Sequence, residues 1–186
     1  MAEPERRFFF DLASPECWLV AERILHTLPQ PCEWVPVHVA DPVPAFRCAE
    51  ESDIWRLEIE RRARALALQA VRWPATVPFD SEFAMRCATY ARGAGKTVPF
   101  ALAAFRQAYC AGRDLGEPDN VMVAAAACEL HPRALEKGVE LRSTADALEA
   151  ATASAPASVP AITVGDAVFS GEDGPELALA ALAPSR

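Results

Sequence analysis

The 186-residue sequence lacks the paired cysteines of a dithiol redox centre. Its six cysteines are spread along the chain, and no two of them form a C-x-x-C pair or a zinc-type ligand set. The three histidines are scattered as well, so no metal site is predicted. These absences argue against disulfide exchange by two neighbouring thiols and against a structural zinc.

The sequence also lacks a long apolar run. No stretch approaches the roughly 20 apolar residues of a membrane-spanning helix. The first residues include acids and Pro4, and only Phe8-Phe9-Phe10 precede Asp11, which leaves no apolar region for a signal peptide. We therefore expect a cytoplasmic protein without a membrane partner, whose cysteines are free thiols in a reducing compartment.

The sequence has fewer positive than negative side chains. The chain carries 18 lysines and arginines against 26 aspartates and glutamates, which gives a formal net charge of -8. Such a surface repels phosphate backbones and anionic headgroups, so nucleic acid is not an expected partner. The length suits one domain, or one domain that carries a large insert.

The N-terminal pattern predicts a strand, a helix and a second strand. The uninterrupted run Phe8-Phe9-Phe10 is typical of a strand buried on both faces. Ser14-Pro15 then predicts a helix start, because serine is a good N-cap and proline is favoured at the first helical position. Residues 33–39 read as a strand in which Pro36 favours an edge position or a bulge. This order favours a parallel βαβ unit.

The middle of the chain is predicted to be helical, and the end returns to strands. We expect helices over Ile54 to Val71, from Phe79-Asp80-Ser81 to Gly93, over Val98 to Cys110, after an Asp119-Asn120 cap, and within Leu135 to Ala153. Residues 159–164 and 167–169 flank a Gly165-Asp166 turn and predict a hairpin. A closing helix is expected over Glu176 to Leu182.

Several local motifs resemble those of one known family. They are an aromatic strand followed by Asp and Ser-Pro, a mid-chain Arg-x-Pro…Pro element, a long helix with its turn, a Val-Pro segment and an aromatic-x-Gly-x-Asp motif. In this sequence they read Phe9-Phe10-Asp11-Leu12-Ala13-Ser14-Pro15-Glu16-Cys17-Trp18, Arg72-Trp73-Pro74 with Val77-Pro78, Phe100 to Asp114, Val159-Pro160-Ala161 and Phe169-Ser170-Gly171-Glu172-Asp173. Together they resemble the DsbA-like branch of the thioredoxin fold, and within it the 2-hydroxychromene-2-carboxylate isomerases and kappa-class glutathione transferases.

The resemblance implies an α/β thioredoxin fold, βαβ–ββα, with a large all-helical insertion of DsbA type. Residues 1–44 and 155–186 would form the split thioredoxin-like domain, and residues 45–154 the helical insertion. Relatives of this kind are often dimers, so a homodimer is compatible with the resemblance.

Ser14 stands where redox relatives carry their reactive cysteine. A helix N-terminus stabilises a thiolate through unpaired N–H groups and the helix dipole. The resemblance implies that Ser14 donates a hydrogen bond to the sulfur of bound glutathione or another low-molecular-weight thiol, which then does the chemistry. The simpler interpretation is that Ser14 only caps the helix.

Cys17 occupies the second-cysteine position of the redox relatives. It could act as a single-thiol redox or glutathionylation site, or it could simply fill the core, since free cysteine is commonly buried.

Two further segments would complete the thiol site by resemblance. Val159 would offer its backbone to the thiol substrate next to a cis Pro160. Gly171, Glu172 and Asp173 would bind the thiol cofactor, with Asp173 holding the γ-glutamyl amine of glutathione, although Asp173 also suits an N-cap.

The substrate pocket would hold Glu16, Trp73 and Phe100, where the two aromatic residues are alternatively core filler. Glu16 and Glu172 are acidic departures from the family, and a charge at Glu16 opposes thiolate formation. The Arg61-Arg62-Arg64 cluster reads as a solvated helix face.

Three functions therefore remain open from sequence. The first is a thiol-dependent isomerase, transferase or oxidoreductase that uses Ser14 and acts on a small molecule. The second is a monothiol disulfide oxidoreductase that uses Cys17. The third is a non-catalytic thioredoxin-fold module whose acidic groove takes a peptide or a cationic ligand.

Overall fold

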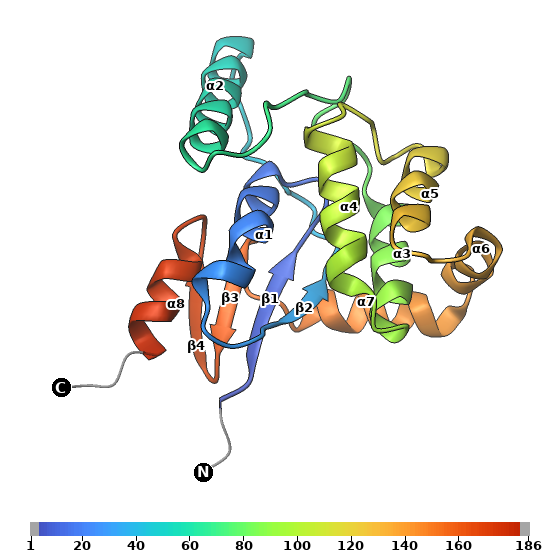
Figure 1. Cartoon of the computed structure of the whole chain (residues 1–186). Coiled ribbons are helices and arrows are strands. Elements are labelled where there is room, and N and C mark those ends of the chain that lie inside the picture. The colour runs from blue at the N-terminus through green and yellow to red at the C-terminus, as the bar shows by residue number, and fades with distance from the viewer. Residues whose placement is uncertain (1–3, 183–186) are drawn as a thin grey trace.

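The computed structural model describes residues 4–182. A four-stranded sheet has the order β2-β1-β3-β4, in which β1 is parallel to β2 and antiparallel to β3, and β3 is antiparallel to β4 (Figure 1). The strands are β1 (Arg6–Phe10), β2 (Glu33–Pro36), β3 (Ala161–Val164) and β4 (Ala167–Ser170).

The described residues also form eight helices. They are α1 (Pro15–Thr27), α2 (Ala49–Ala65), α3 (Glu82–Gly93), α4 (Thr97–Tyr109), α5 (Pro118–Ala127), α6 (Pro132–Val139), α7 (Arg142–Ala153) and α8 (Gly174–Leu182). Helices α2–α7 lie between β2 and β3, so the predicted order βαβ, helices, ββα is confirmed.

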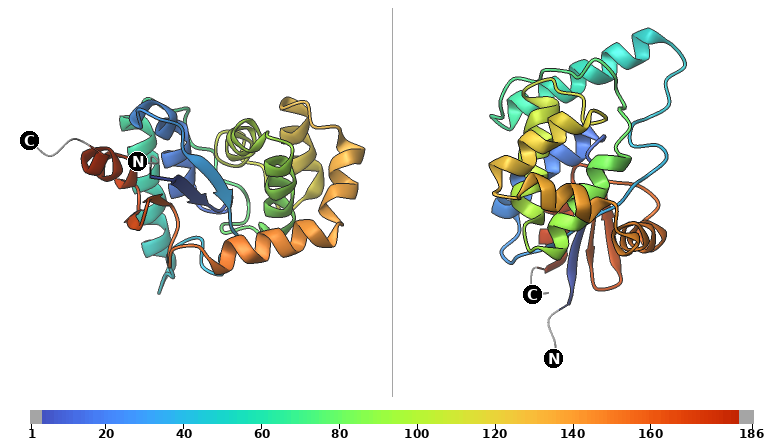
Figure 2. Two further views of the ribbon diagram at one scale, coloured as in Figure 1. Left: turned by 90° about the horizontal axis from the view of Figure 1, so that it is seen from below. Right: turned by 90° about the vertical axis from the view of Figure 1, so that its right-hand side faces the viewer.

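The alternating side chains of β1 separate two layers of core. Phe8 and Phe10 point to the larger one, where they pack with Trp34 against α1 and α4. Phe9 points to the other face, where it packs with Val35 of β2 and Ala151 of α7. In Figure 2, α7 runs from the sheet to the helical block, so the insertion closes the second face of the sheet.

Several predicted boundaries are corrected. Strand β2 ends at Pro36 rather than at residue 39. The His38 amide donates to the Thr152 hydroxyl and the Val39 amide to the Asp11 carboxylate, so neither amide pairs with a strand. Strand β2 is an edge strand, as Pro36 indicated. Helix α5 begins at Pro118, so the Asp119-Asn120 cap was placed too late.

Helix α2 differs most from the expectation. It begins at Ala49 rather than Ile54 and ends at Ala65 rather than Val71. Just beyond its end, Ala67 has a φ of 55°, a left-handed conformation that a helix cannot continue through. Figure 1 shows α2 apart from the block of α3–α7, beyond the N-terminal end of α1.

Candidate functional site

Ser14 caps helix α1. Its backbone is extended, with φ -96° and ψ 113°, and its Oγ accepts a hydrogen bond from the Cys17 amide at 3.3 Å. Pro15 follows at the first helical position, so the predicted N-cap is confirmed. Ser14 has no exposed surface, because the surrounding segments cover its hydroxyl.

The buried carboxylate of Asp11 holds the turn before this helix. Its Oδ1 accepts from the Ala13 amide at 2.9 Å, and its Oδ2 accepts from the Val39 amide at 3.0 Å. Burial raises the pKa of Asp11, although these amides and Ser81 oppose the shift. Asp11 therefore ties the start of α1 to the segment that follows β2.

Strand register places the Val159–Pro160 segment at the same end of the sheet. Phe9 pairs with Ala161, so Pro160 lies beside the end of β1 that leads to Ser14. The Val159–Pro160 peptide bond is cis, as is Val77–Pro78. The Pro160 carbonyl accepts a hydrogen bond from the Gly171 amide at 2.8 Å, which brings in the turn after β4.

The turn from β4 to α8 is held on two sides. Gly171 has a φ of 84°, a conformation that glycine adopts freely. The Arg23 guanidinium donates to the Glu172 carbonyl, and Arg62 forms a 2.5 Å ion pair with the Glu172 carboxylate. Asp173 is exposed beside them. The negative charge of Glu172 is thus balanced by Arg62 of α2.

This pairing corrects the interpretation of the arginine cluster as a solvated helix face. Arg62 is about one third exposed and also pairs with Glu58 at 2.8 Å. Arg61 pairs with the same carboxylate at 2.7 Å. The two guanidinium groups lower the pKa of Glu58 to about 2. Arg61 and Arg62 therefore bring positive charge to the turn that contains Glu172.

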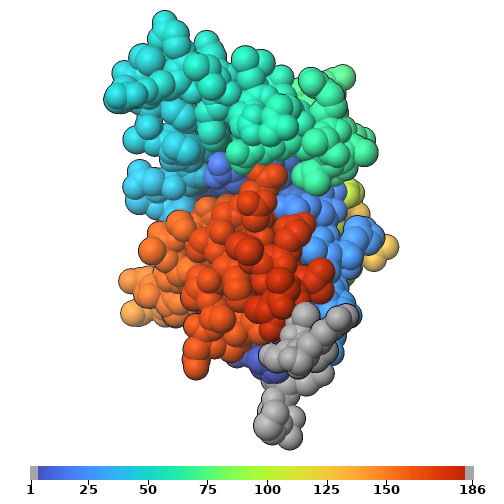
Figure 3. Space-filling view, turned by 90° about the vertical axis from the view of Figure 1, so that its left-hand side faces the viewer, coloured from blue at the N-terminus to red at the C-terminus, as the bar shows by residue number. Residues whose placement is uncertain are grey.

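A polar pocket of about 440 Å³ opens between α2 and the β4–α8 turn. In Figure 3, α2 and the C-terminal strands and helix lie on the same face, with the N-terminal segment visible between them. The pocket combines guanidinium groups, carboxylates and a small apolar wall, and its lining residues are Glu58, Arg61, Arg62, Ala65, Leu66, Glu172 and Asp173.

Glu16 lies in the first turn of α1 and is partly buried among the same groups. Burial raises the pKa of its carboxyl, and the nearby charge of Glu172 raises it further. The Trp55 indole and Arg62 oppose the shift, although the Trp55 N–H does not reach full hydrogen-bond geometry. Glu16 is therefore a titratable group next to residues that line the pocket.

Cys17 lies on the buried side of α1. Its thiol has no exposed surface, and burial raises its pKa well above the usual value, with the nearby Asp11 and Glu16 charges adding to the shift. A neutral, enclosed thiol is a poor nucleophile. The geometry therefore favours the interpretation of Cys17 as core filler over a reactive thiol.

The structure separates the two predicted pocket aromatics. Trp73 is partly buried, packs 5.7 Å from Trp55, and donates to Glu60 at 2.8 Å. Through this contact it supports Trp55, whose indole interacts with Glu16. Phe100 has no exposed surface and lies in the core on α4, so it does not line a pocket with Trp73, because α4 turns this ring inward.

Sequence reasoning missed Arg62, Trp55 and the structural role of Asp11. Asp11 carried a signal, since a carboxylate directly after a buried strand needs hydrogen-bond donors. Arg62 and Trp55 carried no usable sequence signal, because a charged or aromatic residue on α2 does not reveal which element the helix contacts.

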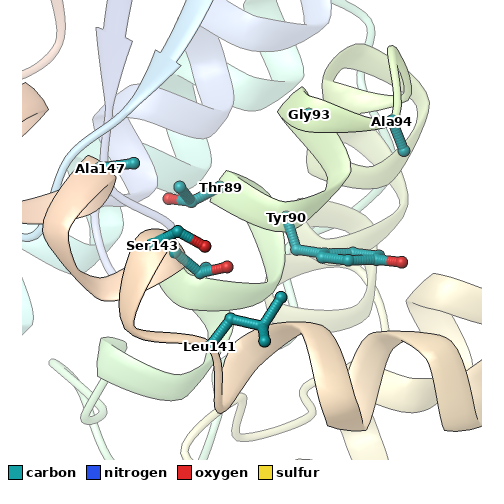
Figure 4. A pocket seen from close by; sticks show the side chains of 8 residues that line it. Thr89, Tyr90, Gly93, Ala94, Leu141, Ser143 and Ala147 are labelled. Carbon is teal, nitrogen blue, oxygen red and sulfur yellow. The ribbon is translucent and has the colours of Figure 1, made fainter.

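Another cavity, of about 380 Å³, lies in the helical block and is unrelated to these residues (Figure 4). Two of its hydroxyl groups are engaged, since Thr89 bonds to the Met85 carbonyl and Thr144 to the Gly138 carbonyl. Within residues 4–182, no three His, Cys, Asp or Glu side chains are grouped so that they could hold a metal ion. None of the helices described is long and apolar enough to cross a membrane.

A sheet of this order, with a capped helix after β1, a Val-Pro segment before β3 and a helical block between β2 and β3, defines a thioredoxin fold with a DsbA-type insertion. In agreement, the family model of the DSBA-like thioredoxin domain matches residues 7–183. The chain therefore belongs to the DSBA-like thioredoxin domain family.

Solved structures agree with this assignment. A 2-hydroxychromene-2-carboxylate isomerase aligns with a TM-score of 0.83 at 15% identity, over 95% of this chain and 93% of that one. A probable DsbA oxidoreductase from Streptomyces coelicolor aligns at 0.74 and 17% identity, over 98% and 93%.

A more distant structure is the cytosolic disulfide reductase DsbM from Pseudomonas aeruginosa with GSH, with a TM-score of 0.62 at 11% identity, over 88% of this chain and 87% of that one. At these identities the likeness shows the fold alone. No curated protein matches the sequence.

Proposed function

We propose that this protein is a thiol-dependent isomerase or transferase that binds glutathione or a similar low-molecular-weight thiol at the N-terminal end of α1. The observation that carries the proposal is the meeting of three distant segments at one end of the sheet. These are Ser14 at the cap, the segment around Pro160, and the turn of residues 171–173, beside a polar pocket of about 440 Å³.

The chemistry of the pocket matches a thiol peptide with charges of both signs. Glutathione carries two carboxylates and one amine. Arg61 and Arg62 supply guanidinium groups for a carboxylate, beside their ion pairs with Glu58. Asp173 is exposed and suits the amine. The thiol would then extend toward the positive end of α1.

A hydrogen bond from Ser14 to the bound sulfur has one structural requirement. Its hydroxyl has no exposed surface, so a sulfur can accept a hydrogen bond from it only when the covering residues shift. One related structure, the cytosolic disulfide reductase DsbM, was solved with GSH, which supports the same class of ligand. The enclosed Cys17 thiol offers no comparable support for the monothiol alternative.

Isothermal titration of the full chain with glutathione tests the proposal. We expect measurable heat, and a loss of affinity of roughly threefold to tenfold in Ser14→Ala, as the loss of one hydrogen bond of about 1 kcal/mol implies. Ser143→Ala on α7 is the matched control, because that serine lines the unrelated cavity. Absence of heat with the unaltered chain would overturn the proposal.

A further inference from the structure

We infer that Glu16 is the acid–base residue of the thiol site, and that its carboxyl group and the thiol of the bound cofactor share one proton. This inference rests on the proposed function and deepens it. The position is acidic here, whereas the related isomerases and transferases carry an aromatic residue after Ser-Pro.

The position of Glu16 on α1 supports this role. Glu16 lies two residues after Ser14, in the first turn of α1, so its side chain and the cap share the end of the helix where a thiolate would be stabilised. The charges that act on Glu16 from outside α1 include Arg62 and Glu172, and both of these residues line the polar pocket. A ligand in that pocket with its sulfur near the helix end would meet the Glu16 carboxyl.

The ion pairs of Arg62 also support this role for Glu16. Three carboxylates, those of Glu16, Glu58 and Glu172, interact with the guanidinium group of Arg62. Arg62 bonds directly to Glu172 at 2.5 Å and to Glu58 at 2.8 Å. It acts on Glu16 through charge alone. Of these three carboxylates, Glu16 is the one without a direct ion pair to Arg62, so its negative charge is the least compensated.

The remaining neighbours of Glu16 are also compatible with a change in its protonation state. The Trp55 indole N–H approaches the carboxyl from α2, but the geometry falls short of a hydrogen bond. The Cys17 thiol and the Tyr109 phenol interact with its charge from the core side, and burial raises the pKa of both, so both stay neutral. Burial raises the pKa of Glu16 toward the range of a stabilised thiol, which favours proton exchange between them.

The proton balance is simple. In the resting complex Glu16 is ionised and accepts a hydrogen bond from the S–H group. As a sulfur lone pair formed the bond to an electrophilic, doubly bonded carbon of the acceptor, the π electron pair of that double bond would move onto the acceptor, the S–H bond would break, and the proton would pass to a Glu16 oxygen. Glu16 then returns the proton to the acceptor, or to the sulfur when the carbon–sulfur bond breaks again. No electrons are gained or lost, so no oxidant or reductant is needed.

The test is a pH titration of the glutathione complex, read by the ultraviolet absorbance of the bound thiolate. An ionised Glu16 in contact with sulfur opposes the thiolate. Glu16→Gln should therefore lower the pKa of the bound thiol by at least one unit, which is about tenfold more thiolate at a pH below that pKa. Glu149→Gln, an exposed position on α7, should leave the titration of the thiol unchanged.

A second measurement uses the unaltered chain and does not depend on the folding of a variant. The carboxyl-carbon NMR signal of Glu16 should titrate at higher pH with glutathione bound than without it. The two proposals fail differently. If glutathione does not bind the unaltered chain, the proposed function is overturned, and the role of Glu16 with it. If glutathione binds and neither titration changes, only the role of Glu16 is overturned.

Discussion

Helices α4 and α2 both lie in the stretch between β2 and β3, but they are held in opposite ways. Helix α4 buries Phe100, Phe105 and Tyr109 without exposed surface and packs on α1. Helix α2 buries only Ile59 and Ala63, and it leaves Ile54 and Leu57 more than 60% exposed. Apolar burial therefore fixes α4 as part of the core, whereas polar and aromatic contacts place α2 beside the candidate site.

The difference predicts which helix serves stability and which serves the site. Contacts of α2 with the thioredoxin-like part include the Arg62–Glu172 ion pair and the approach of Trp55 to Glu16. Such contacts contribute little to global stability. They decide, however, how the pocket between α2 and the β4–α8 turn is shaped.

The largest effect is expected in the core. Phe100→Ala should lower the free energy of unfolding by about 3–5 kcal/mol, because it leaves a cavity in a closely packed layer. Ile54→Ala on exposed α2 should change it by less than about 0.5 kcal/mol. Chemical denaturation of both variants measures the contrast, and equal effects would contradict the division between the two helices.

Asp11 should make stability depend on pH. Its folded pKa is raised above the ordinary 3.8, so its contribution is fully present below pH 3.8 and is lost as the pH rises through the folded pKa. The slope can reach about 1.4 kcal/mol per pH unit for one group. Denaturation between mildly acidic and neutral pH should show a flatter profile for Asp11→Asn than for the unaltered chain. Parallel profiles would refute the assignment.

Ser14→Ala should cost about 0.5–2 kcal/mol in unfolding free energy, because the Cys17 amide loses its capping acceptor in a buried position. Thermal and chemical unfolding report this loss. Ser143→Ala, near the start of α7, is the control and should be close to neutral. A cost below that of the control would show that the cap is dispensable.

The smallest global effect is expected for Arg62→Gln. Loss of its partly exposed ion pairs should change the unfolding free energy by at most about 1 kcal/mol. Hydrogen exchange should nevertheless speed up in α2 and in the β4–α8 turn, because their connection is broken. Arg64→Gln, exposed on the same helix, should leave this exchange unaltered. Unchanged exchange in Arg62→Gln would mean that other contacts position α2.

The sequence predicts the parts of the fold that depend on local chemistry. Phe8–Phe10 as a buried strand, Ser14-Pro15 as a helix start and the hairpin around Gly165 follow from burial pattern, capping and turn propensity, and all three are observed. The interaction between α2 and the turn after β4 was not predictable, because it joins Arg62 to Glu172, 110 positions apart, through a partly buried pair of charges. The inward orientation of Phe100 likewise depends on how α4 packs.

Backbone-amide NMR of the unaltered chain, recorded as glutathione is added, tests the central claim most directly. The account predicts that the amides that shift cluster at residues 16–18, 58–66 and 171–174, on both sides of the pocket between α2 and the β4–α8 turn. An unchanged spectrum, or shifts that gather instead around the cavity between α3 and α7, would contradict it.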